Sequence, residues 1–173
     1  PLEFALVALF SVLFAWISAG FWTAMAGFVI RWARGDRFAI TRTLGAEAAA
    51  APLPPEVRIA IVMPIANEDV PGVFARVRVM FDSLARADDA AHFDFYVLSD
   101  SSDPDTRVAE RQAWLELCLD VGGFGRIFYR VRRHRIKRKS GNVADFCRRW
   151  GAHYKYMVVL DADSVMTAAC LGR

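Results

Sequence analysis

The sequence predicts an N-terminal transmembrane helix followed by an α/β domain built on a mostly parallel sheet. Two observations lead to this fold class: an apolar stretch from Phe4 to Ile30 without a charged side chain, and, after residue 58, short β-branched or aromatic runs that alternate with helical patterns. Of the 173 residues, 55% are hydrophobic and 24% are charged, which excludes an intrinsically disordered chain. The net charge of +3 is too small to indicate nucleic-acid binding by itself.

The apolar stretch is long enough to cross a bilayer, because about 20 apolar residues in a helix span the hydrocarbon core. A secretory signal peptide has a basic start and a shorter apolar core, whereas here Glu3 precedes the stretch and Arg31, Arg34, Arg37 and Arg42 follow it. Arginines on this flank favour a cytoplasmic location for it. We therefore predict that residues 1–42 form a transmembrane helix with a basic cytoplasmic flank.

Residues 43–57 are predicted to be a linker rich in alanine and proline. The alanines could extend a helix, but Pro52, Pro54 and Pro55 would end it. A new domain is therefore expected to begin near residue 58.

The domain that follows has four predicted strands, at 58–64, 93–99, 126–132 and 156–161, with a helical pattern between each pair. This order implies a mostly parallel sheet with right-handed crossovers. Ligands of such sheets bind at the carboxyl ends of the strands, so we expect the functional residues there.

The helical patterns predict which side chains face the core. The first places Val73, Val77, Phe81 and Leu84 on one stripe. The second begins at Pro104 after Asp103 as N-cap and is expected to bury Val108, Leu115 and Leu119. The third begins near Asn142 and is expected to bury Val143, Phe146, Cys147 and Trp150. The scattered cysteines indicate neither a disulfide framework nor a zinc site, and they suit a reducing compartment.

Polar residues follow the ends of three predicted strands. The first strand ends in a segment with Pro64, Ala66, Asn67 and Glu68, the second ends in Asp100, and the fourth ends in Asp161 and Asp163. Neither a GxGxxG nor a GxxxxGK[ST] motif occurs, so these two kinds of phosphate-binding loop are not expected.

Asp161 and Asp163 form an Asp-x-Asp pair directly after the run 157–160, which is apolar and is expected to be buried. Oxygen ligands one residue apart at a strand exit can share Mg²⁺ or Mn²⁺ and leave coordination sites for diphosphate oxygens. The alternative is that both carboxylates cap the loop, and position alone does not separate the two hypotheses. A second pair, Asp103-x-Asp105, is expected only to start a helix.

Residues 126–139 are dense in arginine and lysine. Three interpretations compete: a solvated or lipid-facing surface, a nucleic-acid patch, and a diphosphate site at a helix N-terminus. Aromatic residues are too sparse here to favour nucleic acid. We assign most of the arginines to the surface, and only residues 139–142, with Lys139, Gly141 and Asn142, to the diphosphate site.

Four strings resemble the processive family-2 glycosyltransferases when taken in this order after a membrane span: MPIANED, LSDSSDPD, KRKSGNVADFCRRWG and YMVVLDADSVM. The resemblance covers the chain from about Ile59 onward. It is strongest to the members that build the backbone of osmoregulated periplasmic glucans at the inner membrane of Gram-negative bacteria. It implies that residues 58–173 are the nucleotide-binding half of a GT-A (Rossmann-like) domain. The implied reaction is inverting transfer of glucose from UDP-glucose to a growing β-glucan.

The resemblance also implies roles for individual residues. In the family, the segment matching Pro64–Glu68 lines the uridine pocket, the aspartate matching Asp100 contacts the uracil, and the lysine matching Lys139 lies near the diphosphate. Gly141 and Asn142 belong to the same string and are counted in the donor site. The aspartates matching Asp161 and Asp163 are the motif for Mg²⁺ or Mn²⁺, with Asp163 as the main ligand and Asp161 also counted among the UDP-sugar contacts.

Two further motifs of the family, a T-E-D-like base and an acceptor-binding Q-x-x-R-W, do not occur in the sequence. Residues 146–150 (FCRRW) differ from the second at its glutamine and precede the metal motif. No catalytic residue is therefore assigned, and the chain is expected to be part of a longer polypeptide and to lack transferase activity by itself. The expected partners are UDP-glucose, a glucan acceptor and inner-membrane lipids, but not nucleic acid. The alternative function is a membrane-anchored regulatory module that binds a nucleotide or anionic lipid without chemistry.

The arginine flank predicts that everything after residue 31 is cytoplasmic. A single cysteine introduced near position 47 should resist an impermeant thiol reagent added to intact spheroplasts, and it should react after the membrane is opened. Ready labelling in intact spheroplasts would invert the topology.

Overall fold

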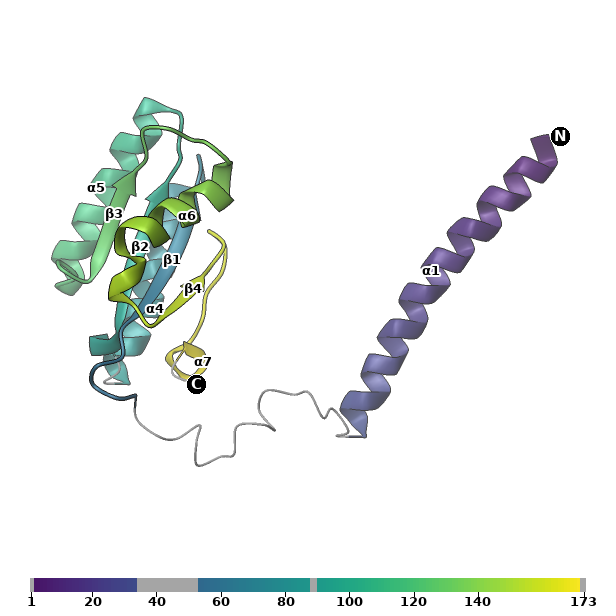
Figure 1. The fold of residues 1–173 in the computed structure, drawn as a ribbon, viewed down its shortest axis with the longest axis horizontal. Coiled ribbons are helices and arrows are strands. Elements are labelled where there is room, and N and C mark those ends of the chain that lie inside the picture. The colour runs from purple at the N-terminus through teal and green to yellow at the C-terminus, as the bar shows by residue number, and fades with distance from the viewer. Residues whose placement is uncertain (1, 34–52, 88–89, 172–173) are drawn as a thin grey trace. The chain divides into compact units, whose positions relative to one another are not determined.

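The computed structural model describes residues 2–33, 53–87 and 90–171, which divide into two compact units, Pro1–Ala51 and Pro52–Arg173 (Figure 1). In the first unit, α1 (Leu2–Trp32) is a single helix of 31 residues that buries none of its side chains. A rise of about 1.5 Å per residue makes it longer than a hydrocarbon core of about 30 Å. Among the residues described, it is the one helix long and apolar enough to cross a membrane. The predicted apolar helix is confirmed, while Arg34, Arg37, Arg42 and positions 43–52 of the predicted linker lie outside the described residues.

The second unit contains a four-stranded parallel sheet in the order β3-β2-β1-β4. The strands are β1 (Ile59–Ile65), β2 (Phe93–Ser99), β3 (Ile127–Val131) and β4 (Tyr156–Val159). They are joined by α4 (Val70–Arg86), η1 (Ala90–His92), α5 (Pro104–Val121), α6 (Arg138–Trp150) and η2 (Gly151–His153), and α7 (Ala168–Leu171) follows β4. The predicted α/β fold class is therefore confirmed.

The sheet is covered on both faces, so β1 is buried along its whole length. Ile61 and Met63 belong to the core that contains the buried side chains of α4 and α5, whereas Ala60 and Val62 belong to a smaller cluster with Phe146 of α6. Figure 1 shows α6 crossing one face of the sheet, with α4 behind it. Val57 is also buried in the larger core, so packing begins within the range predicted as linker.

A buried carboxylate ties together the beginnings of three strands. Asp94 of β2 is 2% exposed and binds Arg58, just before β1, and Arg126, just before β3, at N–O distances of 2.5 and 2.9 Å. The Tyr154 hydroxyl donates to the same carboxylate at 2.8 Å. Because a buried charge without partners is costly, these contacts favour one register at this end of the sheet.

The inward face of α5 differs from the prediction. The predicted start of α5 is confirmed, because the Asp103 carboxylate accepts hydrogen bonds from the Thr106 N–H and hydroxyl. These bonds together lower the Asp103 pKa. However, Val108, Leu115 and Leu119 are exposed. The buried side chains are instead Glu110, Leu117 and Cys118. The apolar pattern failed here because a glutamate occupies a position on the buried face.

Two further expectations need correction. α6 begins at Arg138, one turn earlier than predicted, and Cys147 lies on its exposed side, so Cys147 is not in the core. The run 157–160 was expected to be buried, but Met157 and Val159 are 39% and 40% exposed because β4 is an edge strand of the described sheet. Leu160, just beyond β4, is buried.

Two leucines on α5 test its corrected orientation. Leu117 is 5% exposed and Leu119 is 67% exposed. We expect Leu117→Ala to lower the free energy of unfolding by about 2–5 kcal/mol because it leaves a cavity. Leu119→Ala should change it by less than about 0.5 kcal/mol, as surface substitutions do. Urea denaturation of both variants measures the difference, and a larger loss for Leu119→Ala would contradict the orientation.

Candidate functional site

A cavity of about 770 Å³ opens at the carboxyl edge of the sheet. It lies where the strand order reverses, since β1 is followed along the chain by β2 on one side but pairs with β4 on the other. The predicted residues that line it are Pro64, Ala66, Asn67, Glu68, Asp100, Lys139, Asn142, Asp161 and Asp163. The structure therefore brings together every predicted donor-site and metal residue except Gly141.

Pro64 lies at the point where the cavity opens between β1 and β4. Pairing of these strands ends at Val62 and Val159, and the last hydrogen bond runs from the Leu160 N–H to the Val62 carbonyl at 2.9 Å. Backbone polar groups alternate sides along a strand, so the nitrogen of Pro64 faces the side that β4 has left. A proline there leaves no unpaired N–H, and it is tolerated although β1 is a central strand.

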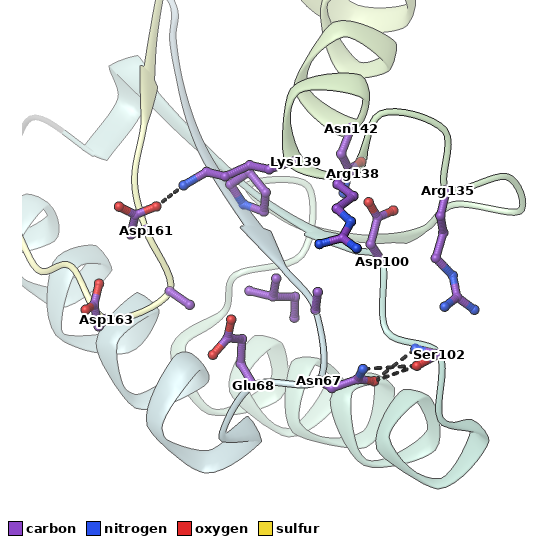
Figure 2. A pocket seen from close by; sticks show the side chains of 14 residues that line it. Asn67, Glu68, Asp100, Ser102, Arg135, Arg138, Lys139, Asn142, Asp161 and Asp163 are labelled. Atoms are coloured by element: carbon purple, nitrogen blue, oxygen red, sulfur yellow. Dashed lines mark hydrogen bonds and ion pairs between the residues drawn. The ribbon is translucent and has the colours of Figure 1, made fainter.

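Asn67 joins the loop after β1 to the loop after β2. Its φ is +56°, a left-handed conformation that asparagine adopts more readily than most residues. Its N–H donates to the Ser101 hydroxyl at 2.8 Å, and its side-chain oxygen accepts from the Ser102 N–H at 2.9 Å (Figure 2). These bonds fix two of the loops that line the cavity relative to each other.

Asp100 is held by an arginine that the sequence analysis did not single out. Arg132 Nε and Nη2 donate to the two carboxylate oxygens at 2.9 and 2.6 Å, the bidentate geometry of a strong ion pair. Arg132 also donates to the carbonyls of Ile136 and Arg138. Both side chains are nearly buried, so Asp100 is positioned at the cavity wall by the loop that leads into α6.

Positive charge in the cavity comes from the start of α6 and the loop before it. Arg135, Arg138 and Lys139 line the wall, and the Lys139 ammonium forms an ion pair with the Asp161 carboxylate (Figure 2). This pair is exposed on both sides, with 52% and 66% of the two side chains accessible. An exposed pair contributes little stability, so either partner can exchange it for another ion.

The basic stretch is divided between structural and pocket roles. Three of its arginines form ion pairs with carboxylates: Arg126 with Asp94, Arg130 with Asp145 and Arg132 with Asp100. The prediction that they belong to a solvated or lipid-facing surface is therefore wrong for these three. Arg135 and Arg138 line the cavity, although the sequence analysis assigned them to the surface. The sequence feature that pointed to Arg135 and Arg138 was the basic run itself, but only the fold shows which residues of that run reach the cavity.

Asp163, Asp161 and Glu68 place carboxylate oxygens on one side of the cavity, as Figure 2 shows. Such hard donors suit Mg²⁺ or Mn²⁺. Within the described ranges, no group of three or more potential ligand side chains is close enough to hold a metal ion together. A cation there would need oxygens of a ligand or of water in addition to the carboxylates of the Asp-x-Asp pair.

Gly141 and Asn142 hold α6 against its neighbours. The Asn142 side chain is fully buried, donates to the Leu98 carbonyl at 2.9 Å and accepts from Arg130, so its polar atoms are already engaged. A Cβ at Gly141 would lie 2.0 Å from the Ile136 carbonyl oxygen. Gly141 is outside the cavity lining, and its effect on the site is exerted through this close approach.

Two glycines of the α6 region make a matched test. We expect Gly141→Ala to displace the first turn of α6, which carries Lys139, and to lower the melting temperature by several degrees through overpacking. At Gly151 the added Cβ would meet only the Cys147 Cβ at an ordinary 3.6 Å, so Gly151→Ala should be neutral. Thermal unfolding of the two variants is the measurement. Equal melting temperatures would contradict the close approach at Gly141.

Comparison with known proteins identifies clear relatives, although no family model matches the chain. The chain is 61% identical over 170 residues to the glucans biosynthesis glucosyltransferase H of Cupriavidus pinatubonensis. It is 59% identical over 172 residues to the protein of the same name from Ralstonia nicotianae, and 56% identical over 172 residues to that of Pseudomonas aeruginosa.

These alignments cover 98–99% of this chain but only 19–20% of the relatives. The chain thus spans about one fifth of the length of the curated relatives it matches. The predicted resemblance is confirmed: over nearly its whole length, the chain is homologous to one segment of the proteins named glucans biosynthesis glucosyltransferase H.

Proposed function

We propose that this chain is the donor-nucleotide-binding part of a bacterial inner-membrane glucosyltransferase, which transfers glucose from UDP-glucose to a growing β-glucan with inversion at the anomeric carbon. The observation that carries the proposal is the cavity at the strand reversal, where Asp161 pairs with Lys139 at the start of α6 and Asp163 lines the same wall. The names of the relatives support glucan synthesis as the purpose of the transfer.

The uridine is proposed to bind on the side of the cavity formed by the loops after β1 and β2. Ala66 and Asn67 supply backbone and amide groups there, and Asp100 supplies a carboxylate held by Arg132. These groups are fixed before a ligand arrives, which lowers the entropic cost of binding. Asp100 is assigned to the uracil and the loop after β1 to the rest of the nucleoside.

The diphosphate is proposed to lie between α6 and the loop after β4. Lys139 would leave Asp161 and bind the phosphate oxygens, with Arg138 and Arg135 close by on the same wall. Asp163, together with the released Asp161, would hold Mg²⁺ or Mn²⁺. When bound, this cation would offset the charge that develops on the departing UDP. The chain's own groups thus bind and orient the leaving group.

The acceptor subsite and the catalytic base are assigned to other parts of the whole protein. The sequence has neither of the family motifs expected to supply them, and the relatives are about five times as long as the chain. The base would remove the proton of the acceptor hydroxyl as it attacks the anomeric carbon. α1 and its arginine flank support an inner-membrane location with the α/β unit on the cytoplasmic side.

The two Asp-x-Asp pairs provide the decisive test. We expect Asp163→Asn in the full-length protein to abolish glucosyl transfer, because loss of a cation ligand removes several kcal/mol of charge stabilisation. Asp103→Asn should leave turnover nearly intact, because Asp103 caps α5 and asparagine is an equally good cap. UDP-glucose turnover in membranes at matched expression, with Mg²⁺ and Mn²⁺ titrated, measures both.

Wild-type turnover and unchanged metal dependence in Asp163→Asn would refute the metal assignment. Binding of UDP without any turnover by the full-length protein would favour the alternative, a membrane-anchored regulatory module.

A further inference from the structure

A buried glutamate lies directly behind the nucleotide side of the cavity and takes no part in the binding proposed above. Glu110 of α5 is 0% exposed. Its Oε1 accepts a hydrogen bond from the Ser101 hydroxyl at 2.5 Å, and its Oε2 accepts from the Tyr129 hydroxyl at 2.7 Å. Among the described residues, no lysine or arginine forms an ion pair with it. Burying a carboxylate without a cationic partner costs free energy.

The Ser101 side chain connects this carboxylate to the cavity. Ser101 is 0% exposed, and its hydroxyl oxygen also accepts the N–H of Asn67 at 2.8 Å. A serine hydroxyl has one proton, and an N–H can only donate, so the proton of Ser101 must go to another acceptor. Glu110 is that acceptor. The carboxylate therefore determines how the hydroxyl is turned, and the hydroxyl in turn holds the backbone of Asn67.

The second bond to Glu110 does not reach the cavity. Burial, followed by the hydrogen bond to Glu110, raises the pKa of Tyr129, so its phenol keeps its proton and donates it. Tyr129 is on β3, and its ring packs near Trp114 and Phe74. One oxygen of Glu110 thus serves packing between α5 and β3, while the other serves the loop after β2.

We propose that Glu110 is a positioning residue for nucleotide binding, which acts through the Ser101 hydroxyl to hold Asn67 in its left-handed conformation at the cavity wall. The inference rests on the proposed nucleotide site. Asn67 has a φ of +56° and carries the bonds to Ser102, so it needs support to stay in a sparsely populated conformation. The loop that contains Asn67 also includes Ala66 and Glu68, which line the cavity.

The test measures UDP affinity of the full-length protein in detergent by calorimetry. Glu110→Leu removes both acceptors at similar volume, and Ser101→Ala removes the connecting hydroxyl. Each should weaken UDP binding about tenfold, as loss of one well-formed hydrogen bond at the site would. Because both substitutions act through the Ser101–Glu110 hydrogen bond, the double variant should bind UDP no more weakly than whichever single variant has the lower affinity.

Two controls separate positioning from general stability. Glu116→Leu changes an exposed glutamate of the same helix, which accepts a hydrogen bond from the Gln112 side chain, and should leave the affinity unchanged. Tyr129→Phe removes the other bond to Glu110 and should lower the melting temperature while keeping the UDP affinity within about twofold of wild type. If Glu110→Leu does not fold, Ser101→Ala and Tyr129→Phe still decide between the two roles.

Unchanged affinity in Ser101→Ala, additive losses in the double variant, or equal losses in Tyr129→Phe and Ser101→Ala would each overturn the inference. Absence of UDP binding by the wild-type protein would instead refute the proposed function, and the inference with it. Tight wild-type binding combined with unaffected variants refutes the positioning role alone.

Discussion

The cavity exists because the pairing between β1 and β4 ends at Val62 and Val159. All strands of the sheet are parallel, so their carboxyl ends and the loops that follow them meet at one edge. Where β1 and β4 separate, the loops on either side can enclose a ligand instead of packing on each other. Pro64 lowers the free-energy cost of this separation because it has no N–H that would be left unpaired.

The two sides of the cavity are built differently. On the side proposed for the nucleoside, Asn67 and Asp100 are held by hydrogen bonds to Ser101, Ser102 and Arg132, of which those to Ser101 and Arg132 are partly buried and those to Ser102 are exposed. On the opposite side, Lys139 and Asp161 form an exposed pair that water and ions can replace. The first arrangement is held by several hydrogen bonds and suits a rigid group, whereas the second can rearrange around a charged group. This division supports a ligand with a flat nucleoside at one end and a diphosphate at the other.

The sequence was sufficient where the determining interactions are local. Strand β2 has the predicted bounds, and the Asp103 cap of α5 depends only on Thr106, three residues away. It was insufficient where the partner comes from a distant segment. Glu110 is buried because hydroxyls from two other elements reach it, and Arg132 leaves the surface because Asp100 accepts hydrogen bonds from its Nε and Nη2. No periodicity in a single helix or strand contains that information, so the buried face of α5 was mispredicted.

The charges of the cavity wall bear on the need for a cation. Four carboxylates line it, Glu68, Asp100, Asp161 and Asp163, against the side chains of Arg135, Arg138 and Lys139. Such a wall does not attract a diphosphate by net charge, in contrast to a purely basic phosphate site. Arg132 offsets Asp100, and Lys139 offsets Asp161 only while the two are paired. If Lys139 turned to a phosphate as proposed, Asp161 and Asp163 would be left as neighbouring negative charges beside a negative ligand. A divalent cation between them removes that repulsion, which is the physical argument for the proposed metal dependence of donor binding.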